Sequence, residues 1–468
     1  MTLSEILMIF ITIYSLFVLI YFVMINSGYL ILLFLGIKEV LFHSRKPDFD
    51  ICDREGCKLI PGITIIVPAY NEEKVISESV KSLLEMKYPK LEILVVNDGS
   101  SDNTLDKLKN NFKLIIVTRE IDENIDTEPI RDIYNSIEEK RLTVIDKENG
   151  GKADALNTGI NYARTDLVLA IDADTLVEKN ALQKLVREYM RTDSRVVAIG
   201  GIVRVLNNCS VISSEVIKAK LPKKFIPGMQ VMEYIRAFLL GRSGWSRINS
   251  LPIISGAFGL FEREGLIEIG GYRIDTVGED IDAVVRLHKK MKQDKEEYKI
   301  SFLPDPVCWT QVPEKIKTLS RQRARWQRGL IETLTYNKDM IFNPKYGKLG
   351  VLSMPFFLFF EMFGPIVEIT GYLMFIVFFL LGVFSLSYFL LFLSVAVIFG
   401  VLISLSSLLL AEMTLKRYED PVDRLKLLFL AILENFGYRQ LHTLWRIKGT
   451  IQFLRKEKKW GEMDRSEI

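Results

Sequence analysis

Two uncharged apolar runs limit the folds open to this chain of 468 residues more than any other feature. Residues 6–25 carry no charged side chain, and neither do the 43 residues from 369 to 411. Because about 20 apolar residues cross a bilayer as a helix, we expect one membrane helix in the first run and two in the second. Gly382 and the segment 385–387 offer a turn between those two. The chain is therefore predicted to be a multi-pass membrane protein.

The segments beside these runs are apolar but interrupted by charged residues. We interpret residues 1–43 as one transmembrane helix with an interfacial continuation over 29–42, and a second crossing there is the alternative. Residues 346–368 contain two prolines and two glutamates, which favours a helix lying at the interface. Residues 412–468 are expected to form a membrane-associated or spanning helix and a basic tail. Glu434 and Arg439 would be costly at the centre of a span unless they face protein or water.

Basic residues predict the orientation of the chain in the membrane. Arg45 and Lys46 follow the first apolar run, and such residues favour the cytoplasmic side. We therefore expect residues 44–345 to form a cytoplasmic domain of a protein of the cell membrane. The first run lacks the basic start and the cleavage site of a secretory signal peptide. A net charge of +3 gives no electrostatic footprint for nucleic acid.

The central region alternates short apolar runs with helical patterns. Strands are expected at 63–67, 91–96, 114–117, 142–145 and 167–171, and helices at 72–86, 101–108 and 153–163. This alternation implies a mostly parallel sheet covered by helices on both faces. Residues 120–140 are polar and mixed in charge, so we expect a solvated excursion between strands there. Ligands of such sheets bind beyond the carboxyl ends of the strands.

Asp172-Ala173-Asp174 directly follows the apolar run 167–171. Alternation along an extended backbone points both carboxylates to the same side. Two such carboxylates repel each other unless a cation or a proton lies near them. Oxygen ligands suit Mg²⁺ or Mn²⁺, which usually keep waters and substrate phosphates as their other ligands. The pair predicts a metal–diphosphate site, and a strand-end turn with two solvated acids is the alternative.

Two other strand ends carry polar clusters. Pro68, Tyr70 and Glu72 follow the first strand, where Tyr70 can stack on a base and either Asn71 or Glu72 can bond its edge. Asp98 ends the second strand and can accept hydrogen bonds from a nucleobase or a ribose. Each cluster also fits the turn that begins a helix. The residues alone leave both interpretations open.

Three further segments offer an anion site, a base and a close approach of the backbone. Lys152 follows two glycines at a helix start, where backbone N–H groups favour an anion and the ammonium adds charge. Gly278-Glu279-Asp280 precedes a helical run, and one of its two acids can act as a general base, although acids at a helix start also complement the macrodipole. Ser255 and Gly256 are small enough to let an extended substrate approach.

Gln322, Arg325 and Trp326 have the spacing i, i+3 and i+4, which places them on one face of a basic helix. An arginine can bind diphosphate bidentately, and a tryptophan offers a flat apolar platform for a sugar ring. A cationic juxtamembrane helix that binds anionic lipid is the competing interpretation. Trp326 beside Arg325 favours a substrate site.

Taken together and in this order, these motifs resemble the membrane-embedded, processive branch of the family 2 glycosyltransferases, which includes cellulose, hyaluronan and poly-N-acetylglucosamine synthases. The resemblance extends from about residue 60 to about residue 330, and the stretch around Lys152 is most similar to the poly-N-acetylglucosamine synthases. It implies an α/β GT-A domain that binds a nucleotide-sugar, flanked by transmembrane and interfacial helices. It also implies a divalent metal, Mg²⁺ or Mn²⁺, as cofactor.

The resemblance further implies a role for each motif. Asp98 would contact the base or ribose, Asp172 the nucleotide-sugar, Asp174 the metal and Arg325 the diphosphate. Asp280 would be the catalytic base of an inverting transfer, and Trp326 part of the acceptor site. A UDP-sugar is the favoured donor, and the expected reaction extends a β-linked polysaccharide.

Two alternatives to that reaction stay open. One is a non-processive enzyme that adds a sugar to a lipid acceptor and makes a glycolipid. The other is a membrane receptor or transporter that carries a nucleotide-binding domain. Because few membrane helices are predicted, an accessory subunit or a homo-oligomer is expected to complete any export channel.

Overall fold

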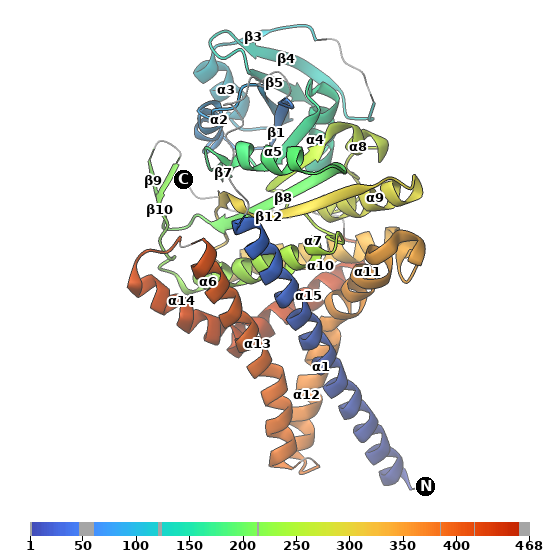
Figure 1. The fold of residues 1–468 in the computed structure, drawn as a ribbon. Helices are drawn as coiled ribbons and strands as arrows, with labels where there is room; N and C mark the ends of the chain where they lie inside the picture. The colour runs from blue at the N-terminus through green and yellow to red at the C-terminus, as the bar shows by residue number, and fades with distance from the viewer. Residues whose placement is uncertain are drawn as a thin grey trace.

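The computed structural model describes residues 2–45, 60–119, 124–212, 215–383, 385–415 and 417–457. In these residues an α/β domain rests on a layer of helices, and three long helices project from the opposite side of that layer (Figure 1). Lys46, on which part of the predicted orientation depends, lies outside the described residues.

One ten-stranded sheet forms the centre of the α/β domain, in the order β3-β4-β5-β2-β1-β6-β11-β8-β12-β7. The strands are β1 (Ile63–Ala69), β2 (Leu91–Asp98), β3 (Leu114–Ile116), β4 (Ile130–Ser136), β5 (Leu142–Lys147), β6 (Leu167–Ile171), β7 (Leu176–Val177), β8 (Arg195–Val205), β11 (Phe258–Glu262) and β12 (Tyr298–Thr310). Strands β4, β7 and β11 run opposite to the other members of the sheet. The prediction of a mostly parallel sheet is confirmed, with antiparallel strands inserted in it.

Helices pack beside the strands of the sheet. They are α2 (Ile76–Leu84), α3 (Thr104–Phe112), α4 (Lys152–Tyr162), α5 (Ala181–Arg191), α8 (Arg263–Glu268) and α9 (Glu279–Gln293). The predicted helices at 72–86, 101–108 and 153–163 are present with shifted bounds, whereas the sequence analysis does not predict α5 and α8. The expectation of an excursion without regular structure at 120–140 is wrong over 130–136, which form β4. This strand pairs with both β3 and β5, and the pairing stabilises a segment whose polar composition hides it. Residues 120–123 lie outside the described residues.

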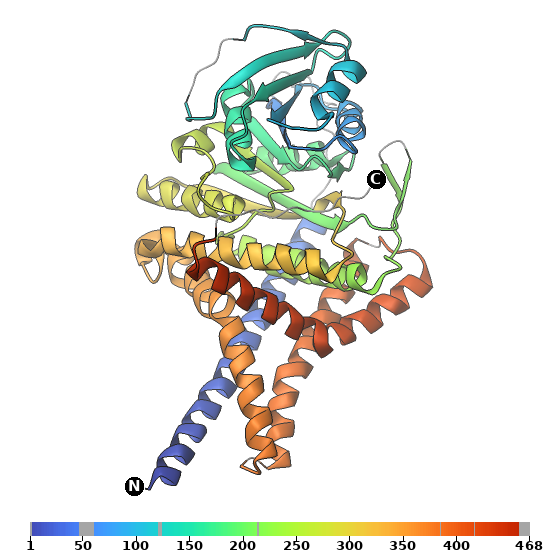
Figure 2. The ribbon, with the colours of Figure 1, turned by 180° about the vertical axis from the view of Figure 1, so that it is seen from behind.

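A layer of helices separates this domain from the projecting helices (Figure 2). It contains α6 (Phe225–Tyr234), the π-helical segment η2 (Ile235–Arg242), α7 (Ser243–Arg247), α10 (Ile316–Tyr336), α14 (Pro421–Leu433) and α15 (Arg439–Leu454). Helices α10 and α15 lie side by side in both views and contact each other. A separate antiparallel pair, β9 (Ser210–Ile212) and β10 (Glu215–Lys218), extends from the edge of the helix layer.

Two helices of the described residues are each long and apolar enough to cross a membrane: 37 residues of α1 (Leu3–Ser44) and all 29 residues of α13 (Leu386–Thr414). A third candidate is α12 (Gly364–Leu380), which follows the helical segments of Leu349–Met362 at a bend of 41°. Gly382, with a φ of +69°, lies in the turn between α12 and α13. The predicted pair of helices is therefore present, with α12 beginning before residue 369.

The structure adds detail to three of the flanking segments. Helix α1 is unbroken through residues 26–28, because the amide of Asn26 donates to Phe22 O at 2.7 Å and Gly28 packs against Phe356. Residues 346–368 form several short helical segments and the start of α12, because Phe363 and Gly364 mark the bend. Residues 412–468 are expected to hold one membrane-associated or spanning helix, and their described part instead contains α14 and α15, because the chain kinks at Phe436 and Gly437.

Candidate active site

The carboxyl ends of β1, β2 and β6 lie at one edge of the sheet, since β1 pairs in parallel with both of the others. At the end of β2, the buried carboxylate of Asp98 accepts hydrogen bonds from the backbone N–H groups of Gly150 and Gly151, at 2.9 and 2.8 Å. It thereby fixes the two glycines that open α4. The side chain predicted to contact a nucleotide thus also organises the loop that carries Lys152.

Lys147 is a site residue that the motif analysis missed. Its side chain is fully buried, and its Nζ lies 3.1 Å from Asp98 Oδ1 and also contacts Asp154. A buried ammonium between two carboxylates neutralises charge where the strands end. The available signal was a lysine at the end of an apolar strand, three residues before the glycine pair.

Lys152 connects the glycine loop to the carboxylate pair after β6. Its Nζ donates to Asp172 Oδ1 at 2.5 Å and lies 3.9 Å from Glu279 Oε1. Although burial alone lowers the pKa of Lys152, the charges of Asp172 and Glu279 raise it, so the side chain stays protonated. The predicted anion-binding lysine therefore lies at the carboxylate pair.

The carboxylate of Asp174 is strongly disfavoured as an anion. Burial, with the charge of Asp172, raises the pKa of Asp174 to about 7. A cation beside the pair would relieve this repulsion, so the donor set fits a divalent metal. Among the described residues no cluster of three or more His, Cys, Asp or Glu side chains could hold a metal ion. A metal here would take its remaining ligands from substrate and water.

Asp280 faces the same place from α9. Its Oδ2 accepts a hydrogen bond from Gly256 N at 3.1 Å, and Lys152 Nζ lies 3.4 Å from the carbonyl oxygen of Gly256. Gly256 therefore lies between the predicted base and the predicted anion-binding lysine. A Cβ on Gly256 would approach Lys152 Nζ to 3.3 Å, so only a small residue leaves the approach open. Ser255 directly precedes it in a partly exposed segment.

A glycine–glycine contact joins α9 to α10. A Cβ on Gly329 of α10 would lie 2.7 Å from Gly278 Cα, and one on Gly278 would lie 2.8 Å from Gly329 Cα. The two backbones therefore touch, and this brings Arg325 into the electrostatic field of Glu279, Asp172 and Asp280. Burial lowers the pKa of Arg325, while those carboxylates oppose the shift. The helix with the Gln-X-X-Arg-Trp pattern is thus locked onto the segment that carries Asp280.

Trp326 is 44% exposed, and the guanidinium of Arg323 lies 4.0 Å from the centre of its ring. Arg323 Nη2 donates to Glu233 Oε2 at 2.8 Å, and its Nη1 donates to the side chain of Gln322 at the same distance. Although burial alone raises the pKa of Glu233, the charge of Arg323 holds it well below its usual range. A buried ion pair therefore supports the predicted platform from below.

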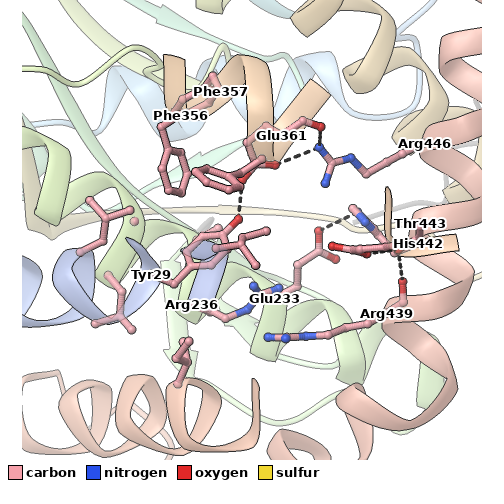
Figure 3. A pocket seen from close by; sticks show the side chains of 18 of the residues that line it. Tyr29, Glu233, Arg236, Phe356, Phe357, Glu361, Arg439, His442, Thr443 and Arg446 are labelled. Atoms are coloured by element: carbon pink, nitrogen blue, oxygen red, sulfur yellow. Dashed lines mark hydrogen bonds and ion pairs between the residues drawn. The ribbon is translucent and has the colours of Figure 1, made fainter. Parts of the chain in front are cut away.

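Below Trp326 a cavity of about 390 Å³ extends between α1, η2, α10, α12 and α15. Figure 3 shows the aromatic rings of Tyr29, Phe356 and Phe357 among the charged groups of Glu233, Arg236, Glu361 and Arg439. Among the described residues, Arg236 Nε, Arg242 Nη1 and Arg439 Nε are buried without a hydrogen-bond partner. Arg236 and Arg439 are within 3.7 and 3.5 Å of Glu434 as ion pairs. The cavity therefore offers apolar faces and guanidinium groups to a polar ligand.

Arg242 is a second residue that the sequence analysis missed. It ends η2, its guanidinium lies 3.8 Å from the centre of the Phe238 ring, and it lines the cavity. Burial lowers its pKa to about 10, while the charge of Asp280 acts in the opposite direction. It belongs to no recognisable motif, so only the fold reveals its place between Asp280 and the cavity.

The remaining predicted residues lie in the last part of β1 or just beyond it, since the strand extends to Ala69 and not only to residue 67 as predicted. Pro68 is in the strand, Tyr70 is 52% exposed beyond its end, and Glu72 is buried with its backbone N–H donating to Thr104 Oγ1 at 2.8 Å. The neighbouring Asn71 accepts a hydrogen bond from Ser101 N at 2.8 Å. The loops after β1 and β2 are thereby joined, with the Tyr70 ring free to meet a flat ligand.

Comparisons with known proteins agree with this geometry. Residues 64–214 match the model of glycosyl transferase family 2, and residues 167–405 match that of glycosyl transferase family group 2. The chain is 30% identical over 331 residues to a poly-β-1,6-N-acetyl-D-glucosamine synthase of Staphylococcus aureus, a match that covers 69% of this chain and 66% of that protein. The synthase of Staphylococcus epidermidis is 29% identical over 276 residues, covering 59% of this chain and 56% of the relative. The chain thus spans just under two thirds of the first relative's length.

A solved structure shares the fold. The mannosyltransferase PcManGT from Pyrobaculum calidifontis, in complex with GDP-Man and Mn²⁺, superposes with a TM-score of 0.50 at 19% identity, covering 94% of this chain and 99% of that one. The family model that spans 167–405 matches more than half of the chain. This chain belongs to glycosyl transferase family group 2, as an enzyme with a GT-A catalytic domain and apolar helices at both ends.

Proposed function

We propose that this enzyme transfers a sugar with inversion from a nucleotide-sugar to a glycan acceptor at the membrane, and so extends a β-linked polysaccharide. The observation that carries the proposal is the convergence of Lys152, Asp172 and Asp280 around Gly256. A carboxylate base, an ammonium and a metal-compatible carboxylate pair around one glycine match the needs of a transfer that expels a diphosphate. The 30% identity to poly-β-1,6-N-acetylglucosamine synthases supports a UDP-N-acetylhexosamine as donor.

In this proposal the donor lies across the carboxyl ends of β1, β2 and β6. Tyr70 stacks on the base, while Pro68 and Glu72 shape its pocket and Asp98 holds the ribose side through the loop that it organises. Asp172 contacts the donor sugar, and Lys152 and Arg325 bind the diphosphate. Charge-assisted hydrogen bonds of this kind are roughly twice as strong as hydrogen bonds between neutral groups.

Asp174, with Asp172, would hold Mg²⁺ or Mn²⁺. Such an ion neutralises the charge that develops on the departing diphosphate. The raised pKa of Asp174 supports this assignment, because a cation is what the crowded pair lacks. The Mn²⁺ in the mannosyltransferase structure is in keeping with it.

Asp280 would take the proton from the acceptor hydroxyl as that oxygen attacks the anomeric carbon from the face opposite the diphosphate. One C–O bond forms and one breaks, and the electron pair of the broken bond leaves on the nucleotide diphosphate. Trp326, Gln322, Ser255 and Gly256 would hold the acceptor. The cavity below Trp326 extends this site with aromatic faces and guanidinium donors suited to a polyhydroxylated chain.

For the topology, we propose that α1, α12 and α13 cross the bilayer and that residues 44–345 face the cytoplasm. Arg45 at the end of α1 supports this orientation. The N-terminus then lies across the membrane from the catalytic domain. An accessory subunit or a second copy would complete an export path.

The test is a nucleotide-sugar panel with the lipid-reconstituted enzyme, in which release of UDP or GDP is measured with Mg²⁺, with Mn²⁺ and with a chelator. We expect turnover of one UDP-sugar, loss of turnover with the chelator, and long products on a sizing gel. Turnover of no nucleotide-sugar would refute the transferase assignment, and turnover unaffected by the chelator would refute the metal role.

A glycolipid synthase is the second candidate. The acceptor cavity is lined by residues of α1 and α12, so a lipid-borne acceptor would reach it from the membrane. Products that partition into organic solvent and carry a single added sugar would favour it over a polysaccharide synthase.

A further inference from the structure

A second hollow lies at the edge of the helix layer, far from Asp280 in the fold. It is a groove of about 580 Å³ between α14 and the start of α6. Its apolar lining comes from Leu221, Pro222 and Phe225 on one side and from Leu425, Leu428, Phe429 and Ile432 on the other. This volume is in the range of small-ligand sites, about 300 to 1,000 Å³.

The apolar side chains of the groove are exposed although their helix is well packed. Leu425, Phe429 and Phe225 have 68%, 61% and 56% of their surface exposed. The opposite face of α14 is buried, and a Cβ on Gly228 of α6 would lie 3.2 Å from Leu430. The helix is therefore held in place by one face and presents a second apolar face outward.

The position of the groove in the fold indicates that it faces the membrane interface. Helix α14 begins at Pro421, shortly after the membrane-span candidate α13 ends at Thr414. Helices α6 and α14 contact each other at the level where the projecting helices leave the layer (Figure 1). Amphipathic helices in this position lie at the boundary of head groups and acyl chains.

The lysines at the rim of the groove favour the binding of an anionic group. Lys223, Lys224 and Lys426 line the groove together with its apolar residues, and no acidic residue of the described part of the chain lines it. Lys224 pairs with Glu314, and Lys426 Nζ lies 3.9 Å from Asp423. The Lys224–Glu314 pair is exposed, and exposed pairs contribute little to stability, so Lys224 can exchange its partner for another anion. Asp423 is mostly buried and accepts a hydrogen bond from Leu221 N at 3.0 Å, whereas the Lys426 side chain is 62% exposed.

We propose that this groove binds one anionic phospholipid, with an acyl chain along its apolar floor and the phosphate at the three lysines. Helix α6 continues directly into η2, which carries Arg236 and Arg242 of the acceptor cavity. A bound lipid thus restrains the helix that shapes the acceptor end of the active site. The lipid site itself does not depend on the proposed reaction.

The experiment measures phosphatidylglycerol retained by the full-length protein after transfer from mixed micelles into phosphatidylcholine nanodiscs. The test variant is Lys223→Gln/Lys224→Gln/Lys426→Gln. The control is Lys81→Gln/Lys87→Gln/Lys113→Gln, which removes the same charge from α2, α3 and their loops, away from the groove. We expect the test variant to retain the lipid about tenfold more weakly than the wild type and the control to retain it as the wild type does. Added salt should weaken retention by the wild type.

A second variant, Leu425→Ser/Phe429→Ser, tests the apolar floor, with thermal unfolding as the folding check. Reduced retention by both groove variants supports a lipid with an inserted chain. Equal competition by soluble glycerol phosphate would show a head-group site only and overturn the proposal. Equal retention by test and control variants would also overturn it, as would a dimer or a bound subunit that the serine variant dissociates.

Discussion

Replacing Gly329 by alanine tests whether the contact between α9 and α10 sets the geometry of the active site. The new methyl group would lie 2.7 Å from Gly278 Cα, 2.8 Å from Gly278 N and 3.2 Å from Val277 C. All three atoms belong to the backbone, so no side chain can rotate away. Since carbon atoms pack at about 3.5 to 4.0 Å, the two helices must separate by roughly 1 Å.

That separation has two measurable consequences. Overpacking of this kind costs about 1 to 3 kcal/mol of stability. Moving Arg325 and Trp326 by about 1 Å relative to Asp280 costs on the order of 100-fold in transfer rate. The loss of activity is thus expected to exceed what the loss of folded protein explains.

The assay is transfer from the active nucleotide-sugar, with thermal unfolding of the same preparations. Gly265→Ala in α8 is the matched control, because its Cβ would meet only side-chain atoms at 3.4 Å or more. We expect the control to keep both activity and melting temperature. A Gly329→Ala enzyme with wild-type activity would refute the idea that this contact aligns base and acceptor platform.

Three other changes probe the neighbouring groups. Asp98→Asn removes the buried negative charge beside Lys147 and weakens the hydrogen bond to Gly150 N. We therefore expect the free energy of unfolding to fall by about 3 to 5 kcal/mol and UDP to bind more weakly in calorimetry. An unchanged melting curve would contradict this prediction. Glu233→Gln frees Arg323 beneath Trp326, so acceptor-dependent transfer should fall about tenfold or more while UDP affinity stays constant, and Glu233→Asp should restore part of it. Burial lowers the pKa of His288 to about 4, below its ordinary 6.5, so the unfolded chain binds the extra proton between these values. The contribution of neutral His288 to the free energy of unfolding is complete above pH 6.5 and falls by about 1.4 kcal/mol per pH unit as the pH drops towards 4. In thermal unfolding, His288→Gln should remove this dependence of stability on pH.

The sequence predicts those elements whose own residues carry the signal. Continuous apolar runs identify β1, β2, β5 and β6, because strands buried on both faces need no polar side. Strand β4 escapes notice because Arg131, Asp132 and Asn135 break its pattern, and its pairing with two neighbours compensates. The insertion of antiparallel β11 between β6 and β8 depends on tertiary packing, which periodicity does not report.

The site shows the same division. Lys152, Asp172 and Asp280 come from recognisable motifs, and the fold brings them to Gly256. Lys147, Glu233 and Arg242 act through burial and contacts across distant segments, so a single sequence cannot single them out from other charged residues. Gly329 also cannot be recognised from the sequence, because its role depends on close contact with the backbone of Gly278.

The most direct test of the central claim compares wild-type enzyme with Asp280→Asn for UDP binding and for transfer from the UDP-sugar that the panel identifies. The Asp280 carboxylate accepts hydrogen bonds from the backbone N–H groups of Gly256 and Ile281. Its interaction with Lys152 and Arg325 is electrostatic, so the variant should still bind UDP with an affinity close to that of the wild type. Without the base, transfer should fall by about 100- to 10,000-fold. Transfer by Asp280→Asn at the wild-type rate would contradict the account.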